Sequence, residues 1–115
     1  MAKPMTIQQA GRLLAHPLRV QLLEAYTAGE CSPSDLADTY EFVPTSPGRK
    51  PKRRKVLRLG PIGNVSYHTR QLASAGAIKQ VRLAPVRGAV EHFYEATHEG
   101  RKVLAVQIAW EELGG

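Results

Sequence analysis

The chain has 115 residues, of which 43% are hydrophobic and 23% charged, and its formal net charge is +6. This length suits one domain, residues 1–115, with a single modest core, and the composition is that of a globular protein. No apolar run approaches the ~18–20 residues that span a bilayer, and the start of the chain shows no secretory signal, so we expect a cytoplasmic protein without a membrane segment.

Three helices are predicted in the first third of the chain. Apolar residues at helical spacing indicate a helix over residues 7–14, and Pro17 suits the first position of a second helix that runs to about Ala28. Gly29 ends that helix. Ser32 is a natural cap for a third helix, which we expect to stop near Thr39 or Tyr40.

Residues 41–60 differ from the rest of the chain in composition. Three prolines and a glycine within residues 44–51 predict a flexible loop without regular structure. Seven of the 16 basic residues of the chain fall in it, with no acid between them, so the positive charge is concentrated in this segment. They are Arg49, Lys50, Lys52, Arg53, Arg54, Lys55 and Arg58. Nucleic acid is the first candidate partner for such a cluster.

The second half of the chain predicts a helix, a hairpin and a last helix. The first of these covers about residues 61–76, two strands follow over 77–83 and 89–96, and a helix runs from 99 to about 113. Helices followed by a two-stranded hairpin make an α+β winged helix-turn-helix arrangement, here with the long basic loop inserted in its turn. In this arrangement the helix before the hairpin reads duplex DNA.

The reading helix and the hairpin tip supply further candidate DNA contacts. The polar side chains of the helix suit base edges and phosphates, although a solvated helix face has the same composition. These candidates are Asn64, Ser66, Tyr67, Thr69 and Arg70. Arg87, at the tip of the predicted hairpin, is a further candidate contact to the adjacent groove or backbone. For His68, we favour a structural role that orients the helix over a phosphate contact.

Several motifs resemble the ArsR-type winged helix-turn-helix family of bacterial transcription regulators. They are Ala15-His16-Pro17-Leu18-Arg19, Ser34-Asp35-Leu36-Ala37, the run from Val65 to Gly76, and Glu91-His92-Phe93-Tyr94-Glu95-Ala96. The resemblance covers most of residues 7–97. It implies a homodimer that binds operator DNA, usually as a repressor, with Val65 and Leu72 of the reading helix packed inward.

The sequence departs from that family in two respects. The family passes from the positioning helix to the reading helix in a few residues, whereas this chain inserts the basic loop. Metal-sensing members carry two cysteines where Ser32 and Ser34 stand, and serine hydroxyls are poor ligands for soft metals. The single cysteine, Cys31, builds neither a disulfide nor a thiolate cage alone. We therefore expect no metal and no cofactor.

The basic loop and the last helix leave alternatives open. The loop suits phosphate or minor-groove contacts, which we favour, but it also fits a solvated linker or, by its Lys-Arg pattern, a nuclear address. The apolar last helix predicts a homodimer contact together with the first helix, through Leu13, Val103, Val106, Trp110 and Leu113. The alternative function is a protein-interaction module that docks a partner through that helix. No catalytic constellation is visible, so we expect no enzyme.

Overall fold

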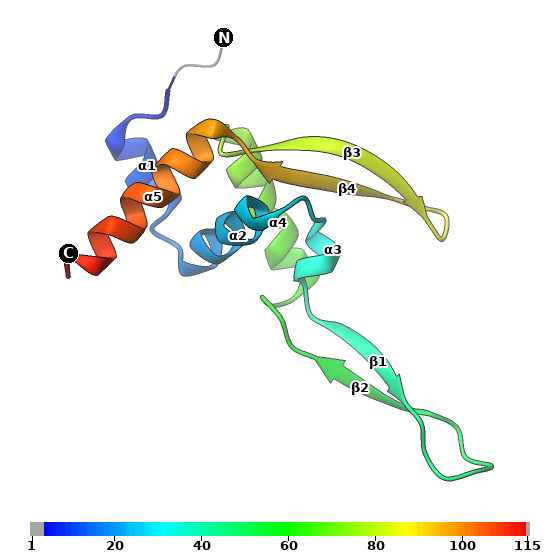
Figure 1. The fold of residues 1–115 in the computed structure, drawn as a ribbon. Coiled ribbons are helices and arrows are strands. Elements are labelled where there is room, and N and C mark those ends of the chain that lie inside the picture. Colours follow the sequence, from blue (N-terminus) through cyan, green and yellow to red (C-terminus); the bar gives the residue numbers. More distant parts are fainter. Residues whose placement is uncertain (1–3, 115) are drawn as a thin grey trace.

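A computed structural model of the chain describes residues 4–114. The fold is mixed α+β, with five helices and two antiparallel two-stranded sheets in these residues (Figure 1). The elements are α1 (Ile7–Leu13), α2 (Pro17–Ala28), α3 (Pro33–Leu36), β1 (Thr39–Val43), β2 (Lys52–Val56), α4 (Ile62–Ser74), β3 (Ile78–Val86), β4 (Ala89–Ala96) and α5 (His98–Glu112).

Local capping explains where several helices begin. The hydroxyl of Thr6 accepts a hydrogen bond from the backbone N–H of Gln9 at 3.1 Å, and the Gln9 side chain accepts from the N–H of Thr6. Ser32 and Asp35 form the same reciprocal pair at α3. Such capping boxes satisfy donors that a helix leaves open at its first turn. Thr97 caps α5 through the N–H of Gly100 at 3.0 Å.

The core lies around α2, which packs against α4, α5 and β4. Leu22, Leu23 and Tyr26 of α2 are fully buried, and so are Val65 and Leu72 of α4, as the sequence predicts. The start of α5 lies directly against the turn between α4 and β3. A Cβ atom on Gly100 would stand 1.9 Å from the carbonyl oxygen of Ala77, so this contact requires glycine.

The β3–β4 hairpin is longer than predicted. The register runs from Ile78 opposite Ala96 to Val86 opposite Ala89, with an irregularity between Gln80 and Arg82. Residues 85 and 86, which the sequence assigns to the turn, belong to β3 instead. Arg87 (φ 49°) and Gly88 (φ 81°) alone make the tight turn, since both adopt the left-handed conformation that two-residue hairpin turns require.

Residues 41–60 are not a loop without regular structure, and that prediction is wrong. β1 and β2 pair in antiparallel register from Thr39 opposite Val56 to Val43 opposite Lys52. The alternating sequence of β1 (TYEFV) favours a strand, and the three prolines of residues 44–51 fall in the connection between the strands. Because the chain enters β1 at Thr39, α3 ends at Leu36, earlier than predicted. We call the β1–β2 hairpin with its connection, residues 39–56, the basic arm.

Among residues 4–114, none of the helices has both the length and the apolar composition that crossing a bilayer requires.

Candidate nucleic-acid interface

Helix α4 presents one face to solvent and one to the core. Gly63, Tyr67, Arg70 and Ser74, spaced at helical intervals, are exposed, whereas the intervening Val65 and Leu72 are buried. Of the other predicted contacts, Asn64 is exposed and Ser66 is half-buried. The structure therefore brings four of the five predicted polar residues of this helix to its accessible side.

Thr69 is the exception, and its assignment as a DNA contact is wrong. The residue is 1% exposed, and its hydroxyl lies 2.9 Å from the hydroxyl of Tyr26, which is fully buried. Burial also raises the pKa of Tyr26 above its usual range. Thr69 stands four residues after Val65 and three before Leu72, so helical periodicity alone already assigns it to the core face.

His68 joins α4 to α2. Its Nδ1 accepts a hydrogen bond from Nε of Arg19 at 2.9 Å, which requires a neutral ring with the proton on Nε2. Desolvation, together with the charges of Arg19 and His16, lowers the pKa of His68 below its usual 6.5. The Tyr67 ring packs edge-on against His68 at 5.0 Å between centroids. His68 therefore has the orienting position that the sequence favours.

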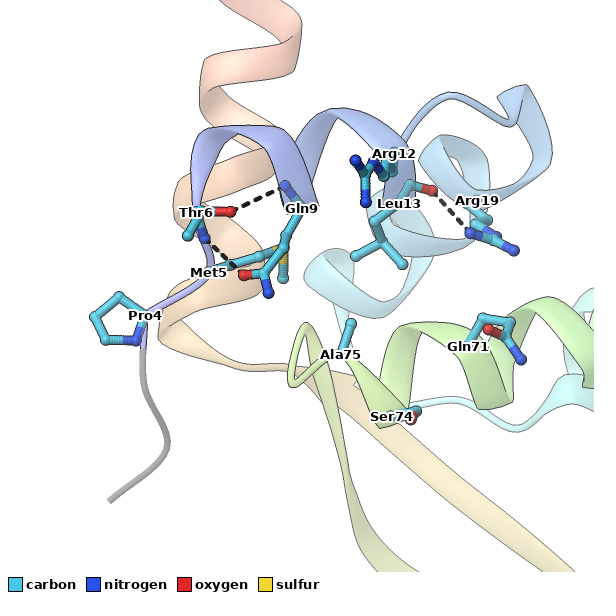
Figure 2. Close-up of a pocket in the computed structure, with 10 residues that line it drawn as sticks. All are labelled: Pro4, Met5, Thr6, Gln9, Arg12, Leu13, Arg19, Gln71, Ser74 and Ala75. Atoms are coloured by element: carbon cyan, nitrogen blue, oxygen red, sulfur yellow. Dashed lines mark hydrogen bonds between the residues drawn. The ribbon is translucent and has the colours of Figure 1, made fainter.

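An open cleft of about 550 Å³ lies beside the carboxyl half of α4 (Figure 2). Arg12 and Arg19 line it from α1 and α2, while Gln71 and Ser74 line it from α4. Arg19 also donates to the carbonyl oxygen of Leu13, at 3.4 Å. Sequence reasoning missed these two arginines, because nothing in the spacing of α1 and α2 indicates that they meet beside the reading helix.

A second cleft, of about 380 Å³, separates α4 from β4 and α3. Ser66 and Arg70 line it from α4, and Glu91 and His92 line it from β4. Within residues 4–114 no carboxylate pairs with Arg70, so its guanidinium is available to a ligand. The cleft lies between α4 and the β3–β4 hairpin and is lined by side chains of both.

Cys31 is half-buried and lies next to the capped start of α3. Burial, followed by the charges of Asp35 and Glu30, raises the pKa of the Cys31 thiol to about 11, which opposes the thiolate that a metal requires. The hydroxyl of Ser32 is committed to the N–H of Asp35 at 3.2 Å. No group of three or more potential metal ligands occurs within residues 4–114.

The two hairpins leave the helical body at opposite ends of α4 (Figure 1). The basic arm leads into the amino end of α4, and the carboxyl end of α4 leads into β3. Arg87 is exposed at the tip of the β3–β4 hairpin. Arg82 of the same hairpin is engaged elsewhere, because it pairs with Glu30 and lies 3.8 Å above the Phe93 ring.

The root of the basic arm is fixed to α3. Oδ1 of Asp38 accepts hydrogen bonds from the N–H groups of Arg58 at 2.7 Å and Gly60 at 3.1 Å. The N–H of Leu59 donates to the carbonyl of Leu36 at 3.0 Å, and the guanidinium of Arg58 donates to the carbonyl of Asp35. Arg58 is therefore a root residue and not part of a free cationic strand.

The other cations of the arm differ in their surroundings. Arg54 forms an ion pair with Glu41, and Lys55 lies 3.9 Å from Asp38. Arg49 and Lys50 lie in the connection at the tip, and Lys52 and Arg53 lie on β2. No carboxylate in residues 4–114 lies within 4 Å of these four. Sequence reasoning also missed two exposed aromatic residues of the arm, Tyr40 and Phe42, although the alternation of β1 indicates them.

The predicted dimer residues divide into two groups. Leu13 and Val103 are 7% and 8% exposed, so they belong to the core of the single chain and offer a second subunit little surface. Val106, Trp110 and Leu113 are 64%, 58% and 84% exposed along α5. A groove of about 440 Å³ between α1 and α5 lies beside them and is lined mainly by apolar side chains.

A comparison with models of known protein families finds no match for this chain, and a comparison with curated protein sequences finds none either.

Proposed function

We propose that this protein binds duplex DNA as a winged helix-turn-helix regulator, with the exposed face of α4 in the major groove. The observation that carries the proposal is the position of α4 between two hairpins that bear cations. Tyr67 and Arg70 are exposed on that helix, Arg87 is exposed at one hairpin tip, and the basic arm begins at the other end. A major groove admits one α-helix, and a reading helix flanked by cationic extensions is the usual way to add backbone contacts.

The side chains of α4 suit the two kinds of contact that such a helix makes. The guanidinium of Arg70 has a planar fork of donors for O6 and N7 of guanine. Tyr67, 48% exposed, and Asn64 offer donors to base edges or phosphates. His68 and Thr69 hold the same helix to α2 from its other side, so the exposed side chains stand on a fixed element.

The regulator acts, in this proposal, as a cytoplasmic homodimer that represses transcription and has no catalytic activity. The exposed apolar residues of α5 and the groove beside α1 support a contact between two copies, since a large exposed apolar patch on a small domain commonly marks an interface. A two-fold dimer would present two α4 helices to successive major grooves, about 34 Å apart.

The same α5 surface favours the second candidate, a module that docks a different protein. Val106, Trp110 and Leu113 are exposed, and none of them lies on α4 or on either hairpin. The two candidates differ in one measurement, because only the first requires duplex affinity that falls steeply with salt.

The test is fluorescence anisotropy with duplex DNA selected from a random-sequence library. Arg70→Ala should narrow the gap between selected and random duplex, since a good bidentate base contact is worth ~1–3 kcal/mol of discrimination. The matched control is Arg101→Ala, which removes the same charge from α5, and α2 lies between that helix and α4. Equal losses on both duplexes would make Arg70 a phosphate contact. No duplex binding at low salt would refute the proposal.

A further inference from the structure

The pairing of the basic arm divides its side chains between two faces, because opposite residues of an antiparallel pair point to the same side. Tyr40 pairs with Lys55, and Phe42 pairs with Arg53. We call these four residues the aromatic face. The opposite face is made by the other three pairs, Thr39 with Val56, Glu41 with Arg54, and Val43 with Lys52.

The aromatic face is apolar and cationic at once. Tyr40 is 52% exposed and Phe42 is 71% exposed, so two large rings are accessible to solvent on a hairpin that extends away from the helices (Figure 1). The guanidinium of Arg53 lies 4.2 Å above the centre of the Tyr40 ring, which holds the cation at a defined place on the face. Rings alternating with cations match the bases, sugars and phosphates of nucleic acid.

The opposite face is less suited to a polyanion. Glu41 neutralises Arg54 there, and the side chain of Val43 is half-buried. On the aromatic face the nearest acid is Asp38, at 3.9 Å from Lys55, and its other oxygen already accepts two backbone N–H groups at the root. Each face therefore carries two cations, one of them with no carboxylate within 4 Å among the described residues, but only the aromatic face carries rings.

We propose that the aromatic face is a second nucleic-acid contact, seated on the duplex next to the α4 site. Arg53 and Lys55 bind phosphates there, and Phe42 packs against the sugars and base edges of the neighbouring groove. The inference rests on the proposed function, because the arm reaches a duplex only where α4 docks. Apolar side chains placed in a minor groove beside basic residues are a common architectural contact.

The length of the arm agrees with this placement. A five-residue strand extends about 16 Å at ~3.3 Å per residue, and neighbouring grooves on one side of a duplex lie about 17 Å apart. The arm leaves the amino end of α4, and the β3–β4 hairpin leaves the carboxyl end (Figure 1). The aromatic face and the Arg87 tip would therefore flank the α4 groove on its two sides.

Two double variants with the same change of charge test the face assignment. Arg53→Gln/Lys55→Gln alters the aromatic face, and Lys52→Gln/Arg54→Gln alters the opposite face of the same strand. On a duplex of about 30 base pairs, the first should lower the slope of log affinity against log salt by about 1.8, because each phosphate contributes ~0.9. Between ~50 and ~200 mM salt this slope corresponds to roughly a tenfold difference in affinity. The second should lower the slope by less than about 0.9.

Phe42→Ala tests the ring without changing the charge. We expect about a tenfold loss of affinity, because the variant loses the apolar contact of one Phe side chain, with an unchanged salt slope, because no charge changes. The thermal midpoint of every variant, measured by circular dichroism, should stay at the wild-type value, since all five residues lie outside the core. Equal slopes for the two double variants, or no effect of Phe42→Ala, would overturn the inference.

The length of the probe separates failure of this inference from failure of the proposed function. A duplex of about 6 base pairs, closed by a hairpin loop, is ~20 Å long, so it covers the α4 groove but not a neighbouring groove centred about 17 Å away. On it the arm variants should bind like the wild type. If the wild type binds neither duplex, the proposed function is wrong. If it binds both and the arm variants match it on both, only the inference is wrong. Tighter, Phe42-dependent binding to a single strand of the same length would overturn the assignment to duplex DNA.

Discussion

Replacing Thr69 by valine removes one hydroxyl from the core while keeping the shape of the side chain. In the folded protein that hydroxyl and the Tyr26 hydroxyl bond to each other at 2.9 Å, with both residues at 0–1% exposure. Thr69→Val therefore leaves the Tyr26 hydroxyl buried without this partner. Such an orphaned group costs ~1–3 kcal/mol of stability.

The double variant Tyr26→Phe/Thr69→Val should recover most of that loss. Removing both partners leaves two apolar surfaces of nearly the same shape, which is close to neutral. We expect each single variant to lower the free energy of unfolding by about 1–2 kcal/mol, and the double variant to be less destabilised than the sum by about 1 kcal/mol or more. For a domain of this size, 1 kcal/mol corresponds to roughly 4 °C in the thermal midpoint.

The measurement is urea unfolding of the four proteins, followed by duplex anisotropy at a temperature where all remain folded. Because Thr69 faces the core, folded Thr69→Val should bind DNA within about twofold of the wild type, a difference under ~0.5 kcal/mol. The reasoning is refuted if Thr69→Val leaves the unfolding free energy unchanged but weakens DNA binding tenfold, because the side chain would then contact DNA as the sequence first indicated.

Three further variants test other contacts. Because the pKa of His68 is lowered in the folded protein, the unfolded chain protonates this histidine more readily. The free energy of unfolding should therefore fall as the pH decreases below about 6.5, where protonation removes the bond from Arg19. In urea titrations, His68→Gln should show a smaller fall of that free energy between pH 7 and 5. Gly100→Ala places a Cβ atom against the carbonyl of Ala77 and should lower the free energy of unfolding by ~1–3 kcal/mol. Gly63→Ala is the control, because a Cβ atom there meets no atom within 4 Å and should not destabilise the fold. A Gly100→Ala variant as stable as the wild type would mean that α5 shifts freely. Trp110→Ala should weaken a dimer about 30-fold, or ~2 kcal/mol, in sedimentation; an unchanged association constant would exclude Trp110 from the contact.

The helices of this chain, apart from the end of α3, could be predicted closely because their ends carry local signals. Pro17 and Gly29 bound α2 as expected, and the capping pair of Ser32 and Asp35 begins α3. The two strands after α4 were also expected, with ends that differ by a few residues. These features depend on contacts between residues close in the sequence, so composition and spacing suffice to indicate them.

The basic arm could not be predicted by the same reasoning, because its prolines and basic residues are typical of a loop without regular structure. The alternation in β1 covers only Thr39–Val43, and the strands pair across a connection of eight residues, 44–51. Its root depends on Asp38 accepting two backbone N–H groups from residues 20 and 22 positions later, which no local pattern reveals. Strand pairing and buried partners of this kind are nonlocal, so a single sequence indicates them poorly.

The closed root of the arm has a consequence for the evolution and engineering of the chain. The N–H of Asp38 donates to the carbonyl of Gly60 at 2.8 Å, so the chain leaves the helical body and returns to it at adjacent points. Closing an unstructured loop of about 20 residues costs roughly 2.5–3 kcal/mol in chain entropy, whereas a hairpin that pairs along its length recovers part of that cost locally. For the packing of the core, the basic arm is therefore equivalent to a short connection whose two ends are fixed. We expect that segments of other lengths, or a short glycine link, can replace residues 39–57 and leave the packing of α3 on α4 intact, since the root contacts of Asp38, Arg58 and Gly60 are kept.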